Sequence, residues 1–207
     1  MKLAFTGSSG SGKTTLVHYV KESYNLKWLN GSSGDIKNED QQTFLKARGM
    51  NVGNGHAEII RAGHENPVVG VFNQDFILQA RLDLIKSNDN FVTDRSPIDN
   101  IVYYIMQCGP YVTEKDTAEF IDKALQGLQE LTHLIYIPAM LPQIEDNGSR
   151  IANTHYQSAV DAVFKMVLIK YMDQLAIGGP KLLVIDVVDL EERKKLVYNF
   201  LGTSNTI

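Results

Sequence analysis

The chain has little cysteine and no long apolar run. Cys108 is the single cysteine among 207 residues, so no internal disulfide can form and a cysteine-based metal site is nearly excluded. No window approaches the ~18 consecutive apolar residues that a membrane span needs, and the N-terminus lacks the apolar segment and cleavage site of a signal peptide. We therefore expect a cytoplasmic protein that makes no contact with a membrane.

Positive charge is also in short supply. The chain carries 20 Lys and Arg against 24 Asp and Glu, a net charge of −4, whereas a general nucleic-acid coat would be basic. This argues against broad nucleic-acid binding but leaves room for a local basic cleft. The apolar fraction of 43% is ordinary for a globular chain with a buried core, and the length suits one domain, with or without a small lid.

Short apolar strands alternate with helical patterns, which is typical of an α/β fold with parallel strands. We expect strands at residues 2–6, 26–29, 91–93, 133–137 and 182–186. We expect helices at residues 14–23, 40–47, 73–86, 113–130 and 154–176, one that starts at Pro97 after the cap Ser96, and one that follows the caps Asp189 and Glu192 to residue 201. The pattern predicts a single three-layer domain built on a parallel five-stranded sheet.

A phosphate-binding motif follows the first strand. Residues 7–14 read Gly-Ser-Ser-Gly-Ser-Gly-Lys-Thr and fit G-x-x-x-x-G-K-[ST], with a strand before them and a helix after them. Such a loop turns successive N–H groups toward phosphate oxygens, and the helix N-terminus adds a positive dipole end. We assign nucleotide binding to Gly7, Ser8, Ser9, Gly10, Ser11, Gly12, Lys13, Thr14 and Thr15, with Lys13 on the β- and γ-phosphates and the Thr14 hydroxyl on Mg²⁺. The motif indicates ATP or a similar triphosphate and leaves the reaction open.

The class of P-loop protein depends on the groups opposite this loop. The guanine motif N-K-x-D is absent, and a small kinase needs an acid at a strand end and an arginine in a lid. Asp94 ends the strand at 91–93, at the sheet edge where ligands bind in α/β folds. It would orient Mg²⁺ or act as general base, and Arg95 would hold a phosphate. Asp186, after the last strand, is a weaker candidate for the same role.

The lid and the acceptor site fall in two polar segments. We expect a lid at residues 139–153, in which Arg150 would stabilise the transferring phosphoryl group, and an acceptor region at residues 30–81, in which Asp35 is a second candidate for the general base. Arginines that converge would indicate a monophosphate acceptor, and scattered ones a nucleoside or another alcohol. The arginines concerned are Arg48, Arg61 and Arg81, and the aromatics that either stack on a base or lie in the core are Phe72, Phe76 and Tyr104.

Three segments together carry a family resemblance: residues 7–14, residues 91–98 (Phe-Val-Thr-Asp-Arg-Ser-Pro-Ile) and residues 144–150 (Ile-Glu-Asp-Asn-Gly-Ser-Arg). The chain resembles the P-loop kinases grouped with the nicotinamide riboside kinase domain of bacterial NadR proteins and, more loosely, thymidylate kinase and the deoxynucleoside kinases. Many bacteriophage proteins look similar. The resemblance implies ATP- and Mg²⁺-dependent transfer of a γ-phosphoryl group to a nucleoside or nucleotide-like acceptor, in nucleotide metabolism or DNA modification. The lid matches in part, because Asn147 interrupts the usual Asp-Gly pair.

Two other functions remain open. A polynucleotide kinase acting on a hydroxymethylated pyrimidine in phage DNA would need a basic strip, for which Lys37, Lys46, Arg48 and Arg61 are the obvious supply. A nucleotide-dependent switch or assembly ATPase would hydrolyse ATP with a protein partner and have no acceptor. The apolar stripe of the helix at 154–176 suits the core, or the interface of a homodimer.

Overall fold

The computed structural model describes residues 1–30, 38–53, 56–139, 153–171, 173 and 176–202. In this part of the chain, five parallel strands form one sheet in the order β2-β3-β1-β4-β5. The strands are β1 (Lys2–Thr6), β2 (Lys27–Leu29), β3 (Phe91–Thr93), β4 (His133–Tyr136) and β5 (Lys181–Val184). The predicted α/β class and parallel five-stranded sheet are confirmed.

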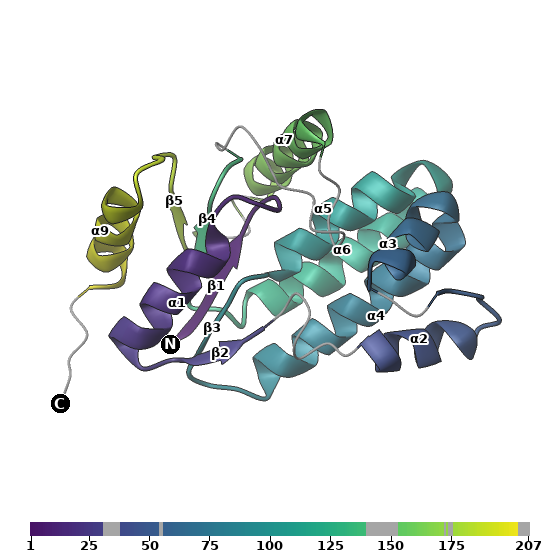
Figure 1. Ribbon diagram of the computed structural model, residues 1–207, viewed down its shortest axis with the longest axis horizontal. Coiled ribbons are helices and arrows are strands. Elements are labelled where there is room, and N and C mark those ends of the chain that lie inside the picture. Colours follow the sequence, from purple (N-terminus) through teal and green to yellow (C-terminus); the bar gives the residue numbers. More distant parts are fainter. Residues whose placement is uncertain (31–37, 54–55, 140–152, 172, 174–175, 203–207) are drawn as a thin grey trace.

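Helices cover both faces of the sheet (Figure 1). They are α1 (Lys13–Tyr24), α2 (Asn38–Lys46), α3 (His56–Glu65), α4 (Pro67–Lys86), α5 (Pro97–Cys108), α6 (Glu114–Leu128), α7 (Thr154–Lys170) and α9 (Leu190–Leu201). No helix in the described part of the chain combines the length and the apolar character needed to cross a membrane.

The alternation of side chains along β1 produces the three layers. Leu3 and Phe5 pack with α1 and α9, whereas Ala4 packs with the larger group of helices α4 to α7 on the opposite face. Successive residues of a strand point to opposite faces, so a strand that is apolar at every position must be covered on both sides. This places β1 in the centre of the molecule and its carboxyl end at the middle of one sheet edge.

Several element boundaries differ from the sequence prediction. α3 was not predicted, and α4 begins at Pro67 rather than at residue 73, because the side chain of Asn66 caps it by accepting a hydrogen bond from Val68 N. α4 is buried on more than one side, so its apolar residues form no single stripe. α7 ends at Lys170 instead of residue 176, since Tyr171 leaves the helical conformation.

Two residues of α5 lie in the core between this helix and its neighbours. The Tyr104 ring stacks on Phe120 with ring centroids 4.0 Å apart, and its side chain is 2% exposed. Tyr104 is therefore a packing residue and does not stack on a bound base. Cys108 is fully buried in the same cluster, and burial raises the pKa of its thiol to about 11.

His133 of β4 makes the stability of the fold depend on pH. Burial, followed by the positive charges of Lys181 and the N-terminus, lowers the pKa of His133 from 6.5. Between that lower pKa and 6.5 the unfolded chain binds more protons than the folded one, so stability rises with pH through this window. We expect the urea midpoint to fall as the pH is lowered from 7.5 to 5.5, and to fall less in His133→Gln.

Equilibrium unfolding of the two proteins at both pH values checks this expectation. His155→Gln, which alters an exposed histidine at the start of α7, should keep the full pH dependence. An identical loss of stability in wild type and His133→Gln would contradict the assignment.

Candidate active site

The loop of residues 7–12 joins the central strand β1 to α1, as the motif predicts. Gly7 has φ 136° and lies so close to the end of β4 that a Cβ would be 2.2 Å from the carbonyl oxygen of Ile137. Gly12 caps α1 at φ 92°, a conformation that favours glycine. The loop thus needs glycine at these two positions for steric reasons, in addition to the close approach of backbone to ligand that glycine allows.

Lys13 is folded back over the loop. Its Nζ donates to the carbonyl oxygens of Gly7 at 2.8 Å and Ser8 at 2.6 Å, and its side chain is 6% exposed. Thr14 and Thr15 are exposed in the first turn of α1, which contains no acidic residue. The N-terminal end of the α1 dipole is therefore not offset by a carboxylate of its own first turn.

The pair Asp94 and Arg95 follows β3, which lies beside β1 in the sheet. Asp94 is 5% exposed. Arg95 Nη1 bonds Asp99 Oδ1 at 2.8 Å and lies 3.5 Å from the carbonyl oxygen of Gly7, so its guanidinium reaches the phosphate-binding loop. Asp186 follows the edge strand β5, two strands from β1, which leaves Asp94 as the stronger candidate.

Asp99 fixes this arrangement. Its Oδ2 accepts hydrogen bonds from Thr6 Oγ1 at 2.7 Å and from Ser96 N at 2.8 Å, while its Oδ1 accepts from Arg95. The N-cap that the sequence predicts at Ser96 is present, and Asp99 extends it to a capping box. The same carboxylate also joins the end of β1 to Arg95, a role that the local pattern does not reveal.

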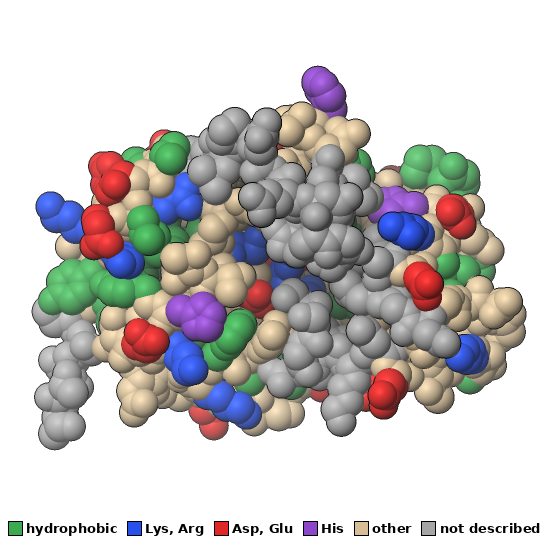
Figure 2. Space-filling view, viewed as in Figure 1, with side chains coloured by type: hydrophobic (Ala, Val, Ile, Leu, Met, Phe, Trp, Pro, Cys, Tyr) green, Lys and Arg blue, Asp and Glu red, His purple; other side chains and the backbone are tan. Residues whose placement is uncertain are grey.

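Arg81 of α4 belongs to the same cluster. It is 5% exposed and donates to the carbonyl oxygen of Ser96 at 3.2 Å. Burial lowers the pKa of Arg81 to about 10, although the charges of Asp99 and Asp94 act in the opposite direction. For Arg95 burial also disfavours the charge, but the Tyr103 phenol, followed by the carboxylates of Asp99 and Asp94, outweighs it and raises the pKa. Figure 2 shows basic and acidic side chains deep in the centre of one face.

A chain of side-chain amides leads away from Arg81 between α4, α5 and α3. Arg81 donates to Asn100 Oδ1, Asn100 Nδ2 donates to Gln74 Oε1, Gln74 Nε2 donates to Gln107 Oε1, and Gln107 Nε2 faces His64 Nε2 at 3.3 Å. A guanidinium can only donate, so the orientation of each amide follows from Arg81. His64 then accepts at Nε2 as a neutral ring, and burial lowers its pKa.

The other predicted acceptor-site residues are not gathered here. The Arg48 guanidinium lies 3.5 Å over the Phe44 ring and 5.4 Å from the Phe72 ring. Phe72 and Arg81 are nine positions apart along α4, roughly 13 Å. Phe76 packs against Phe44, and Arg61 is exposed on α3. Asp35, Lys37, Arg150 and nearly all of the predicted lid at 139–153 lie outside the described residues.

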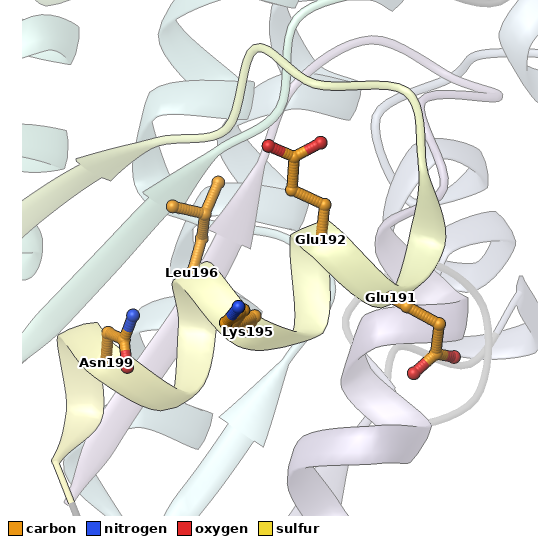
Figure 3. A pocket seen from close by; sticks show the side chains of 5 residues that line it. All are labelled: Glu191, Glu192, Lys195, Leu196 and Asn199. Atoms are coloured by element: carbon orange, nitrogen blue, oxygen red, sulfur yellow. The ribbon is translucent and has the colours of Figure 1, made fainter.

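Two residues that the sequence analysis did not single out contact the loop from distant helices. Gln157 of α7 donates through Nε2 to the Ser9 carbonyl oxygen at 2.8 Å, and Arg193 of α9 donates through Nη1 to the Ser11 carbonyl oxygen at 2.8 Å. The hollow in Figure 3 lies elsewhere, along the side of α9 formed by Glu191, Glu192, Lys195, Leu196 and Asn199. None of these five residues belongs to the predicted site.

Comparison with known proteins assigns the family. A family model described as an AAA domain matches residues 2–193, most of the chain. The chain belongs to this AAA domain family. No curated protein matches this chain.

Solved structures show what fold the AAA domain has. It is similar to a deoxyadenosine kinase from M. mycoides with bound dCTP, at 15% identity and a TM-score of 0.59 over 97% of this chain and 98% of that chain. It is also similar to a thymidylate kinase from Ehrlichia chaffeensis, at 18% identity and a TM-score of 0.53 over 97% of each chain, and to NadR protein in complex with NR, at 14% identity and a TM-score of 0.52 over 97% of this chain and 50% of that chain. The predicted P-loop nucleoside and nucleotide kinase fold is thereby confirmed.

Proposed function

We propose that this protein is a phosphotransferase that moves the γ-phosphoryl group of ATP to a hydroxyl group of a nucleoside. The observation that carries the proposal is the uncharged amide chain that begins at Arg81, beside Asp94 and Arg95 and next to the phosphate-binding loop. Buried amides offer both donors and acceptors, which is what the edge of a nucleobase requires. The kinases that share this fold are named for nucleoside and nucleotide acceptors.

The distribution of arginines supports a nucleoside over a monophosphate as acceptor. Arg48 is folded over Phe44 of α2 and lies near Phe72, nine positions before Arg81 in α4, and Arg61 is exposed. An additional acceptor phosphate would call for several converging cations. Arg81 and Arg95 are the two arginines at the described cluster, and Arg95 already adjoins the loop that would hold ATP.

The chemistry is direct in-line transfer. The acceptor oxygen forms a bond to the γ-phosphorus, the bond from that phosphorus to the β-phosphate oxygen breaks, and the hydroxyl proton passes to the carboxylate of Asp94. Lys13 and Arg95 neutralise charge on the phosphoryl oxygens, and ADP leaves. Catalysis then consists of positioning and electrostatic stabilisation.

The Thr14 hydroxyl would hold Mg²⁺ directly and Asp94 would orient it through a bound water, in keeping with the preference of Mg²⁺ for one or two protein oxygens together with substrate phosphates and water. Mg²⁺ bound with ATP would supply further neutralisation of the phosphate charge. Thr14 is exposed at the start of α1, and Asp94 directly follows β3, the strand beside β1. Arg150 and Asp35 stay candidates for a transition-state cation and an alternative base.

A panel assay with γ-labelled ATP tests the proposal. It would offer nucleosides, nucleoside monophosphates, nicotinamide riboside, and DNA with and without hydroxymethylated pyrimidines. We expect label in a nucleoside. Label in a monophosphate or in DNA would overturn the choice of acceptor, and label in free phosphate alone would favour an ATPase.

Gln74→Leu should separate acceptor binding from ATP binding. Because the change leaves Asn100 and Gln107 with unpaired amide groups, we expect KM for the nucleoside to rise about tenfold or more, with KM for ATP unchanged. Steady-state kinetics measures both constants. Gln79→Leu, on the exposed side of α4, is the matched control, and an equal rise in both constants for Gln74→Leu would contradict the assigned role.

A further inference from the structure

Carbonyl groups of the phosphate-binding loop accept hydrogen bonds from side chains that lie outside residues 7–12. When N–H groups converge on a ligand, the carbonyls turn outward and need partners of their own. Lys13 bonds those of Gly7 and Ser8. The carbonyls of Ser9 and Ser11 instead depend on Gln157 of α7 and Arg193 of α9.

Arg193 is held at both ends of its guanidinium. Nε donates to the carbonyl oxygen of Val187 at 2.6 Å, and Nη1 donates to that of Ser11 at 2.8 Å. The cap at Asp189, whose side chain accepts from Glu192 N, sets the first turn of α9 from which the arginine projects. Arg193 thus connects the segment after β5 to the loop after β1, across 182 residues of sequence.

Gly12 provides the space for this contact. A Cβ on Gly12 would lie 2.8 Å from Arg193 Nη1. The guanidinium therefore packs directly against the backbone at the point where α1 begins. A side chain at position 12 would displace either Arg193 or the turn that leads into the N-terminus of α1.

Arg193 is a buried charge. Its side chain is 4% exposed, and it forms no ion pair with an acidic side chain among the described residues. Nη2 is buried without a hydrogen-bond partner in that same part of the chain. Burial lowers the pKa of Arg193, as expected for a buried charge that carbonyl dipoles alone compensate.

We propose that Arg193 is a positioning residue for the nucleotide phosphates. By holding the Ser11 carbonyl outward, it directs the N–H groups at the start of α1 toward the phosphates. Among the described residues only carbonyl dipoles offset its own charge, and the triphosphate anion would supply the opposite charge on binding. This inference rests on the proposed function, because it requires that the loop bind a polyphosphate.

Titration calorimetry with ATP, inorganic tripolyphosphate and adenosine tests the inference. In Arg193→Met, ATP and tripolyphosphate should each bind about 10- to 100-fold more weakly, since a charge-assisted hydrogen bond and a buried charge are both lost. Adenosine binding should not change. Arg193→Lys, which keeps the charge but has one donor nitrogen in place of three, should recover part of the affinity, and it replaces Arg193→Met should that variant not fold.

The matched control is Lys195→Met, which removes the same charge from an exposed position of α9. It should bind ATP like the wild type. Unchanged tripolyphosphate binding in Arg193→Met, or a loss confined to ATP, would overturn the inference while leaving the proposed function intact. A wild-type protein that binds neither ATP nor tripolyphosphate would overturn both.

Discussion

Lys13→Ala should abolish phosphoryl transfer while the fold survives. Its Nζ now bonds two loop carbonyls, and we expect it to exchange these for phosphate oxygens when ATP binds. One preorganised donor of this kind is worth ~100- to 1,000-fold in rate, and lysine adds a full charge. We expect kcat/KM to fall at least about 1,000-fold in the labelled-ATP assay.

Lys21→Ala, a change at an exposed position of α1, is the control for Lys13→Ala. A thermal unfolding scan of both variants separates lost chemistry from lost structure, and we expect both to remain folded. Normal turnover in Lys13→Ala would refute the assignment of the phosphate-binding loop.

Asp94→Asn should reduce the rate by ~100-fold or more, because an amide of the same shape can neither take up the hydroxyl proton nor contribute a charge near Mg²⁺. Asp94 lies close enough to Arg81 and Arg95 for its negative charge to favour the protonated form of both guanidinium groups. The loss should appear in kcat, with KM for the nucleoside little changed, in steady-state kinetics.

Asp83→Asn, on the exposed side of α4, gives the matched control and should be fully active. A near-native rate in Asp94→Asn would transfer the role of general base to Asp35. Asp35→Asn would then be the decisive variant, because the two acids were the candidates that the sequence offered.

The sequence predicted the parts of the site that are contiguous along the chain. Residues 7–14 carry their geometry in their own order, and the cap at Ser96 determines how Asp94 and Arg95 leave β3. Each of these signals depends on residues within one or two turns of one another. The alternation of strand and helix patterns predicted the parallel sheet for the same reason, because each pattern lies within a short stretch of sequence.

The contacts that support this site could not be predicted in that way. Gln157 and Arg193 meet the loop across 148 and 182 residues, and no local spacing indicates such a pairing. The amide chain from Arg81 was missed because polar residues in a helix usually mark its solvent-facing side, whereas Gln74 and Asn100 are buried. Tyr104 shows the opposite case. Its position in the sequence was consistent with either a core residue or a residue that stacks on a base, and the structure places it in the core.

The buried thiol of Cys108 has a practical consequence. Thiol reagents react with the thiolate, and a pKa of about 11 in a fully buried position leaves almost none available. The speed at which such a reagent labels the native protein therefore records how often the core opens. A compound that binds the folded chain slows that labelling in proportion to its occupancy. The rate of Cys108 labelling can thus rank ATP, tripolyphosphate and nucleosides as ligands before any phosphorylated product is known.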